Sequence, residues 1–164
     1  MTADAAMDSP WRIRHAGDED RGFILGLVPR FTGFELPAWR TRRELDDGIR
    51  RDLSTRLDDL PPGSWMFIAE DEAGTPVGFL HLMQFADFFT GGRNGHVSDL
   101  AVAEGFDGRG IGRFLLDFAE AFCRDRGFER MQLAVFPGNT RALALYQTLG
   151  YGIEMHRMVK PIRR

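Results

Sequence analysis

The chain has 164 residues, a length that fits one domain around a single hydrophobic core. Its formal net charge is -3, from 24 acidic and 21 basic residues, which argues against a nucleic-acid binder because such proteins usually carry a basic stripe. No apolar run approaches the ~20 residues that cross a bilayer, the N-terminus lacks a signal pattern, and Cys123 is the only cysteine. We therefore expect a cytoplasmic protein that binds neither membranes nor nucleic acids.

The first part of the chain predicts a tail, a strand and two helices. Residues 1–10 are small and acidic and read as a flexible tail, and residues 11–15 alternate as a short strand does. Asp18 can cap a helix over residues 18–28. Leucine and isoleucine then recur every three to four positions over residues 41–60, which predicts an amphipathic helix.

The pattern then changes to period two and predicts a sheet. Strands and helices are predicted in turn from here as far as Lys160. In chain order these are strands over residues 65–70, 77–85 and 96–102, a helix over 111–126, a strand over 130–136, a helix over 139–149 and a strand over 151–160. The order βααβββαβαβ predicts an α/β protein with a mixed sheet, formed as one domain by residues 11–160.

Glycines recur at positions 108, 110 and 112, between a predicted strand and the helix that follows it. Glycine lets the backbone curl so that N–H groups at the helix N-terminus face one point, which suits an anion such as a pyrophosphate. Arg109 and Arg113 add side-chain charge. The spacing fits neither the dinucleotide fingerprint nor the Walker loop, and a plain tight turn is the alternative interpretation.

A second motif begins at Asn139 and ends at Tyr151. Asn139 is placed to cap a helix, and Tyr146 lies two helical turns further on, so both share one face. Tyr146 is one of only two tyrosines in the chain. Taken alone, it is better explained as a half-buried core aromatic than as a catalyst.

Together the two motifs resemble the GCN5-related N-acetyltransferase (GNAT) superfamily, over most of the chain from Trp11 to Lys160. The signature R/Q-x-x-G-x-G/A falls on residues 107–112, with Asp107 where Arg or Gln is usual. A carboxylate there repels phosphate unless it is paired, and Arg109 or Arg113 is the expected partner. The downstream signature N-x-x-A-x-x-x-Y-x-x-x-G-F/Y is matched at Asn139, Ala142, Tyr146, Gly150 and Tyr151.

The resemblance implies acetyl-CoA as the acyl donor, no metal, and a central pair of strands that splay apart to admit the donor. It implies backbone contacts from Leu100, Ala101 and Val102 to pantetheine, a pyrophosphate site at Gly108, Arg109, Gly110, Ile111, Gly112 and Arg113, a pantetheine contact at Asn139, and Tyr146 as the acid that protonates the leaving thiolate. A phenol with a pKa of ~10 can serve in that role.

His96 is the candidate general base, because an imidazole near pKa ~6.5 accepts a proton near neutrality. The alternative is a polar residue at a strand end. By strand periodicity we expect Ser98 on the His96 face and Asp99 on the opposite face. His81, on a neighbouring strand, is interpreted as structural.

The acceptor site is expected from the link between the first two helices and from the glycine-rich loop over residues 86–95. Its candidates are Glu35, Trp39, Asp87, Phe88 and Ser98. Acidic and aromatic groups suit a cationic amine, although solvated loops with core aromatics explain them too. We expect a small-molecule amine as acceptor and a possible homodimer. The alternatives are a protein or peptide acceptor, or a non-catalytic acyl-CoA-binding regulatory module.

Overall fold

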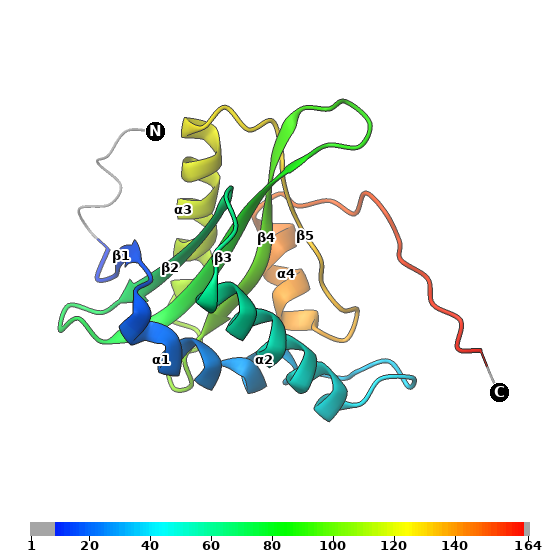
Figure 1. Ribbon diagram of the computed structural model, residues 1–164, viewed down its shortest axis with the longest axis horizontal. Helices are drawn as coiled ribbons and strands as arrows, with labels where there is room; N and C mark the ends of the chain where they lie inside the picture. The colour runs from blue at the N-terminus through cyan, green and yellow to red at the C-terminus, as the bar shows by residue number, and fades with distance from the viewer. Residues whose placement is uncertain (1–8, 163–164) are drawn as a thin grey trace.

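The computed structural model describes residues 9–162 and shows one five-stranded sheet with the strands in chain order. The flexible tail predicted for residues 1–10 lies almost wholly outside the described residues. The strands are β1 (Arg12–His15), β2 (Ser64–Glu70), β3 (Pro76–Ala86), β4 (Arg93–Val102) and β5 (Met131–Leu133). Neighbours are antiparallel except β4 and β5, which are parallel. The predicted mixed sheet is thus confirmed (Figure 1).

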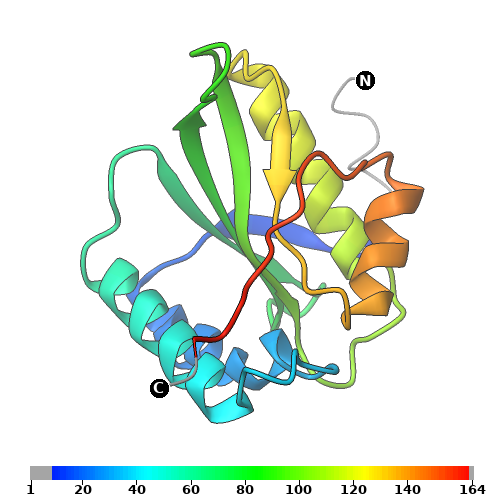
Figure 2. The ribbon, with the colours of Figure 1, turned by 90° about the vertical axis from the view of Figure 1, so that its right-hand side faces the viewer.

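Helices cover both faces of this sheet and enclose two separate apolar clusters. Helices α3 (Ile111–Asp125) and α4 (Thr140–Thr148) lie on one face, and α1 (Arg21–Gly26) and α2 (Arg42–Asp58) lie on the other (Figures 1 and 2). The α3-side cluster includes Phe67, Leu80, Val97, Leu115 and Phe122. The α2-side cluster includes Ile24, Leu53, Ile68, Phe79 and Ala101. The sheet is therefore buried on both faces, which fixes the direction of each strand side chain.

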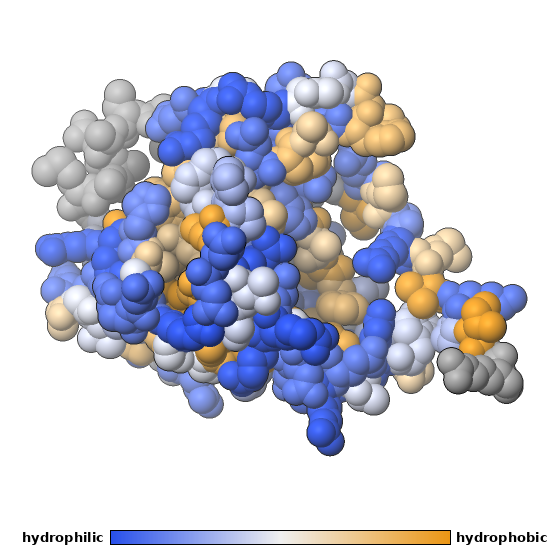
Figure 3. Space-filling view, in the orientation of Figure 1, coloured by the Kyte–Doolittle hydropathy of each residue, from blue (hydrophilic) through white to orange (hydrophobic). Residues whose placement is uncertain are grey.

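Helix α2 begins and ends where its sequence predicts. The Thr41 side chain accepts a hydrogen bond from the Glu44 N–H (3.2 Å) and caps the helix, and the helix ends shortly before Pro61. Leu53 is fully buried, while the outer face carries charged residues and is predominantly hydrophilic in Figure 3. Within residues 9–162, no helix combines the length and apolar character that crossing a membrane requires.

The helix predicted over residues 18–28 is divided into three short pieces. A 3-10 turn, η2 (Asp18–Asp20), precedes α1, and a second one, η3 (Val28–Phe31), follows it. Pro29 lies in the first turn of η3, where proline is tolerated but cannot extend the preceding helix. The division turns the chain toward the end of β4, where η3 contributes to the candidate site.

The strand predicted over residues 151–160 is wrong. Residues 149–162 form neither helix nor strand, and Ile153, Met155 and Met158 are 70%, 73% and 92% exposed. Alternating side chains assign faces, but a strand also needs a neighbour with free backbone groups over its length. The neighbouring strand, β5, has only three residues. Figure 1 shows the segment running away from the sheet.

Candidate functional site

The sheet opens between its two parallel strands. β4 pairs with β5 only from Gly95 to Val97, whereas β3 pairs with β4 as far as Val102. The strand predicted over residues 130–136 is shortened to Met131–Leu133, and this shortening creates the opening. On the β5 side, the backbone from Ser98 to Val102 thus has no strand beside it among residues 9–162. The splayed central pair expected from the sequence is confirmed.

The connection from β4 to α3 curls tightly over residues 103–110. Gly105, Gly108 and Gly110 have φ values of +82°, +75° and +82°, a region that favours glycine, and Gly110 is the N-cap of α3. The N–H groups of the first turn have no carbonyl behind them in the helix, and the helix dipole is positive at this end. The loop therefore presents backbone donors to an anion at the open end of β4.

Asp107 is paired, but its partners differ from those expected. The sequence predicts Arg109 or Arg113 as the partner. The carboxylate instead accepts from Arg30 of η3 (2.5 Å) and from Arg141 of α4 (3.1 Å). The Arg109 guanidinium instead lies over the Phe106 ring, 4.8 Å from its centroid. The negative charge at the loop is neutralised by two arginines that arrive from opposite faces of the sheet.

Arg30 has a second contact that bears on the backbone groups of β4. Its Nε donates to the Val102 carbonyl (3.0 Å). Of the three residues predicted to offer backbone groups to the donor, Val102 thus already has a side-chain partner for its carbonyl. Leu100 packs against the α3-side cluster and Ala101 belongs to the α2-side cluster, so the strand divides the two clusters at the opening.

Helix α4 places Asn139 and Tyr146 along the same side of the opening as α3. The Asn139 side chain accepts from the Ala142 N–H (3.3 Å), which confirms its capping role. Tyr146 packs against the α3-side cluster, and burial raises the pKa of its hydroxyl above the ordinary value, so the phenol is protonated at neutral pH. A Cβ on Gly112 would lie 3.3 Å from the Leu145 side chain, which shows how closely α3 approaches α4.

A β-bulge in β4 changes which side chains share a face. His81 is opposite Asp99 and Leu82 is opposite Val97, so Ser98 is the extra residue. Val97 and Leu100 both pack into the α3-side cluster, although they are three positions apart. The expectation that Asp99 lies on the face opposite to His96 is therefore wrong: Asp99 lies on the α2 side of the sheet with His96, because the bulge resets the alternation. The face on which Ser98 lies stays a prediction.

A buried chain of three polar side chains runs across β2, β3 and β4. Ser64 Oγ is 2.7 Å from His81 Nε2, and His81 Nδ1 is 2.9 Å from Asp99 Oδ2. Because a carboxylate only accepts, Nδ1 donates to Asp99. Sequence reasoning missed this chain. The available signal was a histidine in the middle of an apolar strand, since such a residue needs polar partners.

His96 is partly buried at the point where β4 and β5 separate. Its Nδ1 lies 3.5 Å from the Gln132 amide nitrogen on β5, and the ring meets the edge of Phe85 on β3. Burial lowers the pKa of His96 below its ordinary value, His81 lowers it further, and the negative charge of Asp99 opposes both. The imidazole is therefore neutral near pH 7, as a general base must be.

The predicted acceptor residues fall into two groups at opposite ends of β4. The loop that carries Glu35 and Trp39 packs on the link between β5 and α4, beside the opening: the rings of Phe34 and Phe136 are 5.6 Å apart. A side chain on Gly138 would collide with the Glu35 carbonyl.

Asp87 and Phe88 belong to the turn between β3 and β4, at the far end of β4 from the opening. The Asp87 carboxylate accepts from the N–H groups of Phe89 and Thr90 and from the Asn94 amide, at 2.9 to 3.0 Å, and Phe88 is 92% exposed. Their role in acceptor binding stays a prediction, but the structure does not bring them to Glu35 and Trp39.

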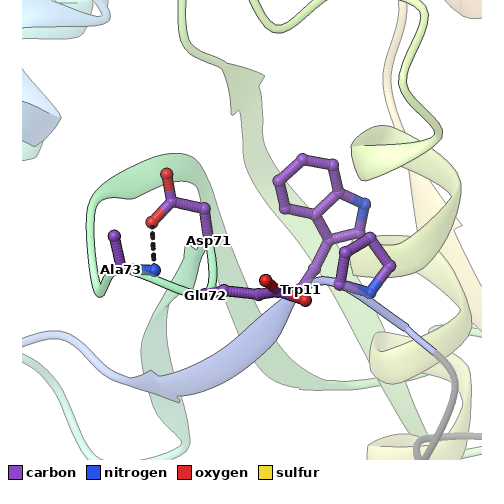
Figure 4. A pocket seen from close by; sticks show the side chains of 5 residues that line it. Trp11, Asp71, Glu72 and Ala73 are labelled. Carbon is purple, nitrogen blue, oxygen red and sulfur yellow. Dashed lines mark hydrogen bonds between the residues drawn. The ribbon is translucent and has the colours of Figure 1, made fainter.

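A shallow hollow elsewhere on the surface has a structural explanation. It lies between the start of β1 and the turn from β2 to β3, lined by Trp11, Asp71, Glu72 and Ala73 (Figure 4). The Asp71 carboxylate accepts from the N–H groups of Ala73 (3.0 Å) and Thr75 (2.8 Å), so it stabilises the turn between β2 and β3.

Comparison with known proteins gives concordant results. The sequence model of the acetyltransferase (GNAT) family matches residues 30–151. A mycothiol acetyltransferase of Propionibacterium freudenreichii is 39% identical over 150 residues, 92% of this chain and 46% of the relative. The thialysine N-epsilon-acetyltransferase of Bos taurus is 36% identical over 148 residues, 84% of this chain and 82% of the relative. The chain thus spans about half the length of the mycothiol acetyltransferase.

Solved structures agree on the fold. An aminoglycoside N-acetyltransferase in complex with CoA superposes with a TM-score of 0.66 at 21% identity, covering 94% of this chain and 95% of that one. At this identity the similarity shows the fold alone. The matched family model and the two sequence relatives together show that this chain belongs to the acetyltransferase (GNAT) family.

Proposed function

We propose that the protein is an N-acetyltransferase that moves an acetyl group from acetyl-CoA to the primary amine of a small molecule. The observation that carries the proposal is the opening beside β4, with glycine-bounded backbone donors at the start of α3 and a protonated phenol on α4. The opening supplies a place for an extended donor, the loop a place for its charge, and the phenol a proton.

The residues present fit acetyl-CoA. A diphosphate suits the positive end of α3, because it accepts several backbone hydrogen bonds at once. Asp107 does not oppose diphosphate binding, since Arg30 and Arg141 neutralise its negative charge. The exposed β4 edge at Leu100 and Ala101 offers backbone groups to an extended pantetheine arm, as an added strand would. Bound there, acetyl-CoA supplies an activated thioester.

The side chains around the opening divide the acid and base work. His96, neutral near pH 7, takes a proton from the attacking amine. Tyr146, protonated at the same pH, gives a proton to the departing thiolate. Amine and thioester react directly when both are held together, so a covalent enzyme intermediate is not needed. Cys123 fits this view, because burial raises the pKa of its thiol to about 11 and keeps it un-ionised.

The acceptor is proposed to enter beside the loop that carries Glu35 and Trp39. A carboxylate and an indole at the mouth suit a cationic amine. Relatives support a small molecule, since they are named as mycothiol, thialysine and aminoglycoside acetyltransferases. We keep Ser98, the bulged residue of β4, as a further candidate lining residue.

Thiol release from acetyl-CoA, measured with a panel of small primary amines and with peptides bearing free N-termini, tests the proposal. Calorimetry with CoA tests the donor half separately. We expect CoA binding and turnover with at least one small amine. Turnover with peptides alone would transfer the proposal to protein acetylation, and CoA binding without turnover would indicate a non-catalytic binding module.

A further inference from the structure

Asp99 is hydrogen-bonded to His81 and lies on the same face of β4 as His96, three positions away, and this placement points to a role in the proposed reaction. We propose that Asp99, anchored by His81 and Ser64, is a positioning residue that stabilises the positive charge His96 acquires on taking the proton of the attacking amine. The inference rests on the proposed function and deepens it, because it identifies what makes His96 an effective base.

The anchoring is explicit in the hydrogen bonds. His81 is fully buried, and both of its ring nitrogens are used, one by Ser64 (2.7 Å) and one by Asp99 Oδ2 (2.9 Å). Rotating the ring would break two buried hydrogen bonds, each costly to leave unmade. The Asp99 side chain is 14% exposed. Within residues 9–162, the structure gives the Asp99 side chain no hydrogen-bond partner other than His81, and Oδ1 has none.

The bulge supplies the second requirement, which is a shared face. Without the extra residue at Ser98, Asp99 would point with Val97 into the α3-side cluster, among apolar side chains. With it, Asp99 and His96 both lie on the α2 side of β4, three positions apart. A β-bulge next to a reaction site commonly re-aims a side chain in this way.

Among the charged groups around His96, Asp99 is the one that favours protonation of the imidazole. Asp99 on β4 opposes the effects of burial and of His81 on the pKa of His96. On β3, the neighbouring Phe85 is apolar, and on β5 the facing Gln132 is uncharged. An imidazolium in this partly buried position therefore depends on the Asp99 carboxylate for compensation.

The amine nitrogen uses its lone pair to form the bond to the acetyl carbonyl carbon, and its proton passes to a ring nitrogen of His96. The carbon–sulfur bond breaks, its electron pair stays on sulfur, and Tyr146 protonates the thiolate. His96 then holds one more proton and one more positive charge, which the negative charge of Asp99 on the same face of β4 compensates.

An NMR pH titration of the His96 ring tests the proposal without any need for turnover. Because Asp99 raises the pKa of His96, Asp99→Asn is expected to lower the titration midpoint, by roughly 0.5 to 1 pH unit. The matched control is Asp125→Asn, which removes the same charge from an exposed position at the end of α3 and is expected to leave the midpoint unchanged. An equal midpoint in wild type and Asp99→Asn, or an equal shift in the control, overturns the proposal.

The anchoring role of His81 has its own pair of variants. In His81→Asn an amide N–H takes the place of the Nδ1 donor and is expected to hold Asp99, whereas His81→Leu removes the donor and is expected to shift the His96 midpoint. Ser64→Ala provides a milder disruption if His81→Leu fails to fold. If the midpoint is insensitive to His81→Leu and to Ser64→Ala, the anchoring part of the proposal is wrong.

Kinetics connect the titration to the reaction. In Asp99→Asn the acid limb of kcat/KM for the amine should move to lower pH with the midpoint, and kcat should fall by up to about tenfold, since one unit of basicity is a factor of ten. KM for acetyl-CoA should not change. Absence of turnover in the wild type would count against the proposed function, while the NMR midpoint would still decide the role of Asp99.

Discussion

The donor side and the acid–base side of the opening are built by different means. The donor side consists of backbone: three glycines with positive φ and the N–H groups at the start of α3. The acid–base side consists of side chains: Tyr146 on α4, and His96 and Asp99, which a β-bulge and a buried hydrogen-bonded chain place on one face of β4. Substitutions should therefore separate donor affinity from chemistry.

The largest effect is expected at Tyr146. Replacing it with Phe removes the proton donor while keeping the ring that packs against the α3-side cluster, so kcat should fall by about 100-fold, the lower end of the range for a general acid. CoA affinity measured by calorimetry should stay within about twofold, because the hydroxyl is not assigned to the phosphate site. The matched control is Tyr151→Phe, whose ring lies 5.6 Å away. Comparable losses of kcat in both variants would contradict the assignment.

At Gly110 we expect a smaller effect of the opposite kind, on CoA affinity and not on kcat. Alanine at its φ of +82° costs roughly 1 to 2 kcal/mol, and the loop can avoid this cost only by moving its backbone donors. We expect the Kd for CoA to rise about tenfold, with kcat at saturating acetyl-CoA little changed. Gly91→Ala is the control, because Gly91 also has a positive φ (+71°) and open space around it but lies at the far end of β4. Equal effects of Gly110→Ala and Gly91→Ala on CoA binding would contradict a specific role for the loop before α3.

Because the ion pairs at Asp107 are exposed, replacing this residue is expected to have a modest, salt-dependent effect on CoA affinity. Asp107→Asn removes a negative charge near the proposed diphosphate and releases Arg30 and Arg141 from it. We expect CoA to bind about two- to fivefold more tightly at low ionic strength, the range of exposed ion pairs, and the gain to fade with added salt. Weaker binding would show instead that Asp107 is needed to hold the loop in place.

The smallest effect is expected at Cys123. The thiol is buried against Gly95 in the α3-side cluster, and burial raises its pKa to about 11. Cys123→Ala should keep kcat within about twofold, because alanine fits with little repacking, and maleimide labelling of the native protein at pH 8 should be slow. Loss of activity with retained stability would instead favour a covalent route through Cys123.

The sequence allowed the backbone-built half of the site to be predicted, because glycine spacing and helix capping act locally. The mixed sheet and the splayed pair also followed from the order of elements. The partners of Asp107 did not, since Arg30 and Arg141 are 77 and 34 residues away and only the folded chain brings them together.

On the side-chain half, His96 and Tyr146 were predicted, but the Ser64–His81–Asp99 chain and the face of Asp99 were missed for a different reason. Period-two alternation assumes an uninterrupted strand, and one extra residue at Ser98 exchanges the faces of everything beyond it. The segment over residues 151–160 shows the complementary failure. Its alternation is regular, but the short β5 edge gives it no partner of matching length, and side-chain pattern alone does not supply backbone hydrogen bonds.

Gly138 joins the loop of the proposed acceptor side to the link between β5 and α4. Because the carbonyl of Glu35 occupies the space of its missing side chain, two segments about one hundred positions apart in the sequence touch without any intervening group. Alanine at position 138 could be accommodated only if one of these two segments moved. Since the amine is proposed to enter beside this loop, the identity of residue 138 is expected to influence the choice of acceptor more than the binding of the donor.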